Sequence, residues 1–90
     1  MQNEQNNYSN LNENEILVLK AIATASEANG GDFTYFDEVV SQINALTQNQ
    51  VKGYISQLSK KNYIYVDEEE FNCQISAGDN VDYLTDYKFN

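Results

Sequence analysis

The segment from residue 47 to residue 66 constrains the fold more than any other part of this sequence. Thr47, followed three residues later by Gln50, forms a capping box, which marks the start of a helix. Apolar residues then recur at helical spacing, at Val51, Ile55 and Leu58. The pattern stops at residues 60–62, where two lysines favour the negative end of the helix dipole and an asparagine tolerates the left-handed conformation that ends a helix. Because strand-forming residues follow at once, we expect an amphipathic helix joined directly to a strand.

A first helix is predicted well before this segment. It follows a capping box at Asn10 and Glu13, and it runs to about residue 27. An Asn-Gly-Gly run at 29–31 breaks any regular structure there. The apolar stripe of this helix consists of Ile16, Leu19, Ile22 and Ala23.

A second, shorter helix is predicted after residues 32–34, which form an extended piece. Thr34 caps this helix, with Asp37 at its third position. Its stripe has no gap and consists of Phe36, Val39, Val40 and Ile43. A tight turn at 44–46 then leads to the helix that begins after Thr47.

Two strands are predicted after the third helix, over residues 63–66 and 71–75. The acidic residues 67–70 form the turn between them. In the second strand, Phe71, Cys73 and Ile75 share one face, so we expect Cys73 to be a core residue. After Gly78 comes a last segment, in which one face of a short final helix carries Val81, Leu84 and Tyr87.

This order of elements is that of a winged helix-turn-helix, an α+β fold. The runs Leu46-Thr47-Gln48-Asn49-Gln50-Val51 and Ile55-Ser56-Gln57-Leu58-Ser59-Lys60-Lys61-Asn62-Tyr63-Ile64 resemble the recognition-helix segment of MarR-type winged-helix proteins. In that family a Leu-Thr/Ser … Val … Leu-xx-Lys-Lys-Gly-Leu-Ile run leads into the wing, and Asn62 stands here where glycine is usual. Phe71 to Ile75, followed by Ser76-Ala77-Gly78, resembles the returning wing strand and the entry to the last helix.

The resemblance covers roughly residues 11–80 and implies a three-helix core with a two-stranded wing. It divides the chain into a disordered leader (1–10), a winged-helix domain (11–78) and a C-terminal extension (79–90). It also implies a small, dimeric, cytoplasmic transcriptional regulator, whose partner is double-stranded DNA and whose reading element is the helix at 47–61. Winged helices also serve as protein-interaction modules, so the resemblance is more specific for fold than for function.

The charge map bears on a DNA partner in two opposite ways. Fourteen acids against five lysines give a formal charge of −9, with no arginine, which opposes binding to phosphates. Residues 39–66, however, contain no acid and three lysines, while the rest of the chain holds two lysines and fourteen acids, a formal charge of −12. The polar face of the third helix is a DNA-contacting surface, a solvated face or a protein-contacting surface. The candidate DNA contacts are Thr47, Gln48, Asn49, Lys52, Gly53, Ser56, Lys60 and Lys61.

Side-chain chemistry assigns roles to these candidates. Asparagine and glutamine pair with adenine, lysine reaches guanine acceptors, and Thr47 or Ser56 contacts phosphate. Gly53 costs about 1 kcal/mol in a helix interior relative to alanine, and its missing side chain allows the backbone of DNA or of a packed helix to approach closely.

The acidic residues favour a second function, which is binding to a basic protein partner. Duplex phosphates would repel the four consecutive carboxylates of the predicted wing tip. An acidic protein-interaction module, or a DNA mimic that antagonises a nucleic-acid-binding protein, would instead use these groups. The candidate surface consists of Asp67, Glu68, Glu69, Glu70, Asp79, Asp82 and Asp86.

Composition excludes several other classes of protein. Without histidine there is no Ser-His-Asp or Cys-His catalysis, and one cysteine forms neither an internal disulfide nor a cysteine-rich zinc site. We therefore expect that the protein is not an enzyme and binds neither a metal ion nor a cofactor. No stretch approaches 18 apolar residues and no signal peptide begins the chain, so we expect a soluble intracellular domain without a membrane partner.

The apolar stripe near the C-terminus has two interpretations. It either forms a homodimer interface or folds back onto the first helix within one chain. The residues of the dimer hypothesis are Leu11, Val81, Leu84 and Tyr87.

Overall fold

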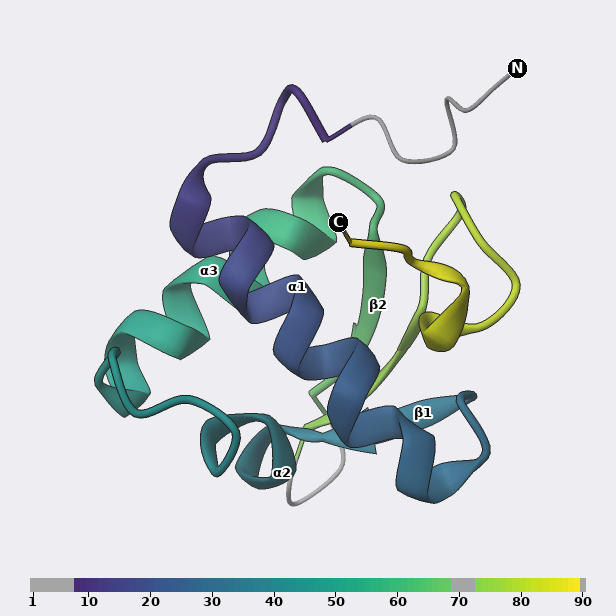
Figure 1. Ribbon diagram of the computed structural model, residues 1–90, viewed down its shortest axis with the longest axis horizontal. Coiled ribbons are helices and arrows are strands. Elements are labelled where there is room, and N and C mark those ends of the chain that lie inside the picture. The colour runs from purple at the N-terminus through teal and green to yellow at the C-terminus, as the bar shows by residue number, and fades with distance from the viewer. Residues whose placement is uncertain (1–7, 69–72, 90) are drawn as a thin grey trace.

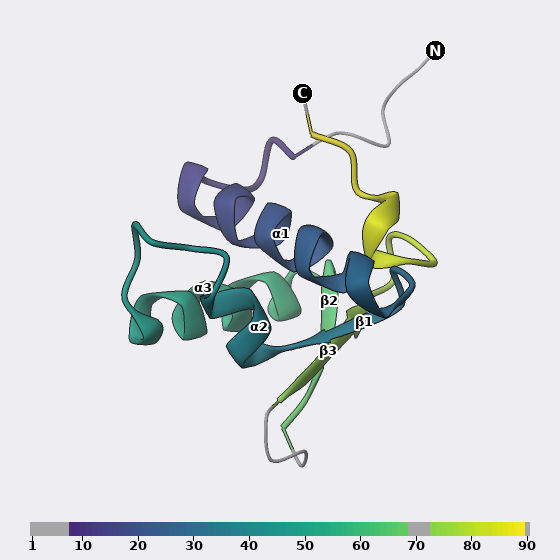
Figure 2. The ribbon, with the colours of Figure 1, turned by 60° about the horizontal axis from the view of Figure 1, so that its bottom comes forward.

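The computed structural model describes residues 8–68 and 73–89, which form an α+β fold (Figure 1). This part of the chain contains three α-helices and one antiparallel sheet of three strands. Helix α1 (Glu13–Ser26) crosses the middle of the domain. Strands β2 (Ile64–Asp67) and β3 (Gln74–Ala77) form a hairpin that extends away from the helices (Figure 2). The sheet and the helices enclose one core, to which α1 contributes the fully buried Val18, Leu19 and Ile22.

Helix α1 begins two residues later than the sequence predicts, so the assignment of Asn10 and Glu13 as its capping box is wrong. The cap is Asn12, whose Oδ1 accepts the Glu15 amide at 2.8 Å, while Glu15 Oε1 accepts the Asn12 amide at 2.9 Å. A turn closed by the bond from the Leu11 amide to the Tyr8 carbonyl, at 2.9 Å, precedes the helix. The predicted end is nearly right, since a 3₁₀ turn (Glu27–Asn29) follows Ser26 directly.

Strand β1 (Phe33–Tyr35) leads directly into α2 (Phe36–Val40). The predicted cap at Thr34 with Asp37 is wrong by one residue. Thr34 is buried in the sheet, and its hydroxyl donates to Glu38 Oε1 at 2.7 Å. The cap is Tyr35, whose amide donates to the same carboxylate oxygen at 3.3 Å.

The stripe predicted for the second helix extends beyond α2. The helix ends at Val40. Turns follow it, in which the Gln42 amide donates to the Val39 carbonyl (3.0 Å) and the Ile43 amide donates to the Val40 carbonyl (3.1 Å). Ile43 is buried although it lies outside the helix. The apolar periodicity thus identified a core residue but not the end of the helix.

Helix α3 (Gln48–Lys60) confirms the prediction from the central segment. Thr47 Oγ1 accepts the Gln50 amide at 3.1 Å, and Gln50 Oε1 accepts the Thr47 amide at 2.8 Å, which completes the capping box. The buried residues of the helix are Val51, Ile55 and Leu58. Asn62 adopts the left-handed conformation, with φ of 69°, and β2 starts two residues later.

The sheet has the order β1-β3-β2, with β3 in the middle. Ile75 is fully buried and lies opposite Thr34 in β1 and Val66 in β2. The bounds predicted for the second hairpin strand (71–75) are wrong, because β3 starts at Gln74 and continues to Ala77. Cys73 has φ of 24°, in the left-handed region, which interrupts the extended backbone before Gln74. Phe71 and Asn72 lie outside the described residues.

The C-terminal segment packs within the chain. Instead of the predicted helix it forms a 3₁₀ turn (Leu84–Asp86), whose Leu84 amide donates to the Gly31 carbonyl at 2.8 Å. The Tyr87 hydroxyl donates to the Tyr63 carbonyl at 2.7 Å, and burial raises the pKa of Tyr87. Leu84 and Tyr87 are therefore core residues of the single chain.

Aromatic rings join the two ends of the described chain. The ring of Tyr8 stacks on that of Phe89, with centroids 5.2 Å apart, and the Tyr8 hydroxyl donates to the Lys88 carbonyl at 2.9 Å. Tyr63 lies beside this contact, because the centroid of its ring is 6.3 Å from that of Tyr8. The predicted leader is thus packed from Tyr8 onward, and residues 1–7 lie outside the described residues.

Candidate nucleic-acid interface

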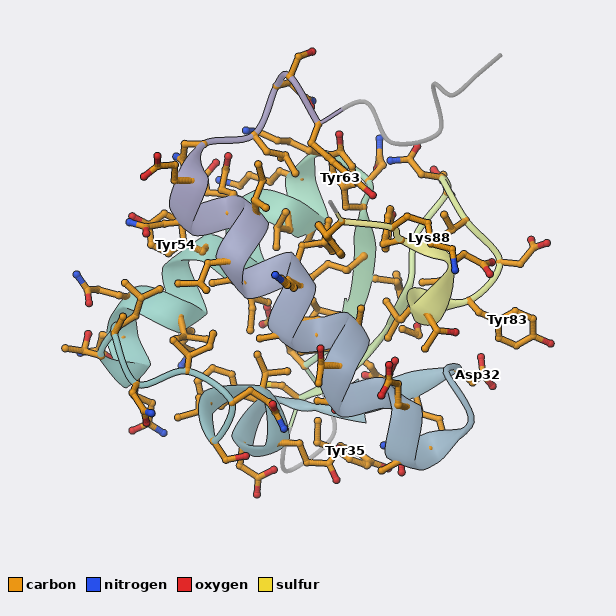
Figure 3. The ribbon with its side chains drawn as sticks, in the orientation of Figure 1. Asp32, Tyr35, Tyr54, Tyr63, Tyr83 and Lys88 are labelled. Carbon is orange, nitrogen blue, oxygen red and sulfur yellow. The ribbon has the colours of Figure 1, made fainter. Side chains whose placement is uncertain are left out.

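The outer face of α3 carries a row of small and carboxamide-bearing residues. Because Val51, Ile55 and Leu58 are buried, the opposite side of the helix faces outward. Asn49, Gly53 and Gln57 follow one another there at spacings of four residues, and Ser56 lies beside them. All four are exposed, and we call them the crest of α3. Tyr54 instead faces α1, where its hydroxyl accepts a hydrogen bond from Asn14 Nδ2 at 3.0 Å (Figure 3).

A groove of about 860 Å³ lies between α3 and the hairpin. Its apolar lining comes from α2, α3 and the hairpin region, and consists of Phe36, Ile55, Val66, Cys73 and Ile75. Lys52 and Lys60 line it from α3, and Glu68 lines it from the hairpin. One wall of the groove is therefore cationic and the facing wall carries a carboxylate.

The structure brings together five of the predicted DNA contacts. Asn49, Lys52, Gly53, Ser56 and Lys60 all line the groove. Gln48 is exposed in the first turn of α3, whereas the Thr47 hydroxyl is occupied by the helix cap. The crest also includes Gln57, which sequence reasoning missed. Its spacing of four residues from Gly53 is the signal that identifies it.

Lys61 lies apart from these residues, because its side chain turns toward α1. Its ammonium group donates to both Glu15 carboxylate oxygens at 3.0 Å and to the Asn10 carbonyl at 2.8 Å. Only 4% of the Glu15 side chain is exposed, against 30% of Lys61. Burial alone would raise the pKa of Glu15, but the Asn12 amide and the Lys61 ammonium outweigh burial and lower this pKa from its ordinary value of 4.5. Lys61 thus holds the end of α3 against α1, which gives it a structural role, and its contact with DNA stays a prediction.

Replacing Lys61 by alanine is expected to destabilise the protein by about 2 kcal/mol, because it leaves a buried carboxylate without its cation. Chemical denaturation at neutral pH measures this loss. Lys60→Ala is the matched control, since Lys60 is exposed at the neighbouring position and its loss should change the free energy of unfolding by less than about 0.5 kcal/mol. Equal effects of the two substitutions would contradict the role assigned to Lys61.

The lowered pKa of Glu15 also predicts a pH dependence. A carboxyl group with a lower pKa in the folded state stabilises the fold above its unfolded pKa, and this contribution disappears as the pH falls through the folded pKa. The stability difference between the wild type and Glu15→Gln should therefore be largest above the ordinary value of 4.5 and shrink below it. Urea denaturation of both proteins between about pH 7 and pH 3 tests this expectation. A difference that stays constant over this range would contradict it.

Gly53 lies in the interior of α3, where no neighbouring atom among the described residues makes a glycine necessary. A Cβ atom built on it meets no atom within 4 Å. The alternative that Gly53 admits a packed helix therefore finds no neighbour among the described residues. Gly53→Ala should stabilise the protein by about 1 kcal/mol, measured by chemical denaturation, because alanine is the better helix former and fits without strain. Unchanged or lower stability would mean that this glycine serves the fold.

The acidic residues of the second hypothesis that the structure describes do not form one cluster. Asp67 and Glu68 lie where β2 leaves the sheet, whereas Asp79 and Asp82 follow the opposite end of β3. Asp86 caps the last turn, with its Oδ2 accepting the Tyr83 amide at 3.0 Å. Glu69 and Glu70 lie outside the described residues. The prediction that Cys73 is a core residue needs correction as well, because Cys73 is half-buried and lines the groove.

Most residues of the dimer hypothesis are buried in the core of the single chain. Leu11, Leu84 and Tyr87 are buried, and Val81 is half-buried against the same core. The described structure has the second arrangement, in which the stripe packs within one chain and covers α1. A homodimer stays a prediction, and in this conformation its interface would need other residues.

The described residues contain no group of three histidine, cysteine or carboxylate side chains placed to hold a metal ion. In the same part of the chain, no helix combines the length and the hydrophobicity needed to cross a bilayer. Comparisons of this protein with models of known families, with curated proteins and with solved structures find no match. The surface of α3 and its chemistry therefore provide the evidence for a function.

Proposed function

We propose that the protein is a winged helix-turn-helix DNA-binding domain that places α3 in the major groove and acts as a small transcriptional regulator. The order of helices and strands and the sheet order β1-β3-β2 support this proposal. In this proposal the hairpin is the wing and α3 is the reading helix. The major groove, about 12 Å wide, admits one α-helix.

The observation that carries the proposal is the exposed cationic face of α3 in an acidic protein. The chain has a net charge of −9, yet α3 has no acidic residue, and Lys52 and Lys60 are both exposed along the groove. Lysines in this position neutralise phosphates and release counterions, which provides affinity for a duplex. The same face bears hydrogen-bonding groups at Asn49, Ser56 and Gln57, which suit contacts to bases or to the backbone.

The hairpin sets a limit to the mode of binding. Glu68 lines the groove opposite Lys52 and Lys60, and duplex phosphates would repel its carboxylate. We therefore expect α3, and not the hairpin tip, to make the principal contacts. Binding through two lysines should be weak and strongly salt-dependent.

Fluorescence anisotropy with a labelled duplex pool of about 20 base pairs tests the proposal, over salt concentrations from about 20 to 200 mM. For two neutralised phosphates, affinity should fall about 60-fold over this tenfold rise in salt, because log K falls by about 0.9 per phosphate for each decade. Absence of binding at the lowest salt would overturn the proposal.

A second candidate function is binding of a basic protein through carboxylates, as an interaction module or as an antagonist of a nucleic-acid-binding protein. The formal charge of −12 outside residues 39–66 favours it, and so does the exposure of Glu68, Asp79 and Asp82. Replacing Lys52 and Lys60 should leave the affinity for such a protein unchanged. It should weaken when Glu68, Asp79 and Asp82 are changed to the corresponding amides, with binding measured by calorimetry against a lysine-rich peptide.

A further inference from the structure

The crest of α3 presents carboxamides on either side of an open glycine. Asn49 precedes Gly53 by four residues and Gln57 follows it by four, so their backbones are about 12 Å apart along the helix axis. This length corresponds to between three and four base pairs at about 3.4 Å per pair. Both side chains are exposed, whereas Gln50 is engaged in the capping box, with its Oε1 accepting the Thr47 amide at 2.8 Å. Asn49 and Gln57 are therefore the amides available on the crest.

The chemistry of this row favours one kind of base pair. A carboxamide pairs bidentately with adenine through N6 and N7, whereas guanine is read by arginine, which the chain lacks, or by lysine. The absence of a side chain at Gly53 leaves space between the two amides, where a thymine methyl group can approach the helix. Lys52 lines the same groove as Asn49 and Gly53 and lies about 100° around the helix from Gly53, so its long side chain can reach a phosphate beside the base edges.

We infer that α3 reads A·T base pairs in the major groove through Asn49 and Gln57, with Gly53 admitting the thymine methyl group between them. This inference depends on the proposed function, since it specifies which duplex the same surface selects. The lysines provide affinity for any duplex, and the crest provides the preference. The partner is thus duplex DNA whose site contains adenine at positions reached by the two amides.

Duplexes with altered base chemistry test the inference, because they keep the number of phosphates constant. The wild type should bind an A·T duplex at least about fivefold more tightly than a G·C duplex of equal length, measured by anisotropy at low salt. Replacing adenine by 7-deazaadenine removes the N7 acceptor from the major groove only, and replacing thymine by uracil removes the methyl group. Each replacement should reduce the preference. Equal affinity for the 7-deazaadenine duplex and the unmodified A·T duplex would overturn the inference, since it would mean that N7 is not read.

Substitutions in the protein provide a second test of the inference. The double variant Asn49→Ala, Gln57→Ala should lose the A·T preference and keep salt-dependent binding, because both lysines remain. Both positions are exposed, and an unchanged unfolding curve would show that the fold is intact. Equal, salt-dependent binding of A·T and G·C duplexes by the wild type would overturn the inference and leave the proposed function standing. Absence of binding to any duplex would overturn both.

Discussion

The double variant Lys52→Ala, Lys60→Ala should lose most of its affinity for duplex DNA. Each lysine neutralises about one phosphate, so the slope of log K against log salt should decrease by about 2, and affinity at low salt should fall at least about tenfold. Neither side chain is buried, so the free energy of unfolding should change by less than about 0.5 kcal/mol. Salt-dependent anisotropy and chemical denaturation on the same samples measure both quantities.

Lys20→Ala, Lys88→Ala is the matched control, because it makes the same change in net charge with exposed lysines outside α3. This variant should bind DNA like the wild type, with an unchanged salt slope. Equal losses in the two double variants would mean that overall charge, and not the face of α3, determines binding. Lys61 is excluded from both variants, since its ion pair with Glu15 would mix a folding defect into the binding result.

Gly78→Ala should destabilise the protein by about 3 kcal/mol. A Cβ atom on Gly78 would clash with the Asn62 carbonyl oxygen and would lie 2.8 Å from the Ile64 nitrogen. These are backbone atoms at the junction of α3 and β2, which cannot move without disturbing that junction. The Gly78 amide donates to the Tyr63 carbonyl at 3.2 Å, so the close approach is part of the hydrogen bonding between the two segments.

Chemical denaturation of Gly78→Ala beside Gly53→Ala gives a comparison of identical substitutions in opposite surroundings. Gly53 has open space and should gain stability, whereas Gly78 has backbone atoms in contact and should lose about a quarter or more of the stability typical for a chain of this length. Wild-type stability in Gly78→Ala would contradict the packing described for the junction.

The sequence predicted α3 well because all of its signals agree. The capping box, the buried stripe and the left-handed Asn62 fall in one continuous segment, and each was confirmed. The start of α1 was misplaced because the sequence offers the same Asn-x-x-Glu pattern twice, at Asn10 and at Asn12. Tertiary contacts separate the two: the Asn10 carbonyl accepts from Lys61, and Asn10 Oδ1 accepts the Tyr63 hydroxyl at 2.7 Å. Local pattern alone does not contain that information.

The start of α2 was misplaced for a similar reason. Thr34 is the better local cap, but β1 buries it in the sheet, and the role passes to Tyr35. In the candidate site, spacing along α3 was sufficient to group Asn49, Lys52, Gly53 and Ser56. It was not sufficient for Lys61, whose direction depends on how α1 packs against the end of α3. Contributions to the groove from Phe36 and Cys73 likewise follow from tertiary structure alone.

We propose α3 as the surface that contacts DNA, and an NMR titration locates the contact surface residue by residue. Amide signals of ¹⁵N-labelled protein would be followed while an unlabelled duplex of about 20 base pairs is added at about 20 mM salt. The shifted signals should belong mainly to residues 48–60, with the largest changes near Lys52, Gly53 and Ser56. Shifts centred on residues 79–86 instead, or no shifts at all, would contradict the proposal.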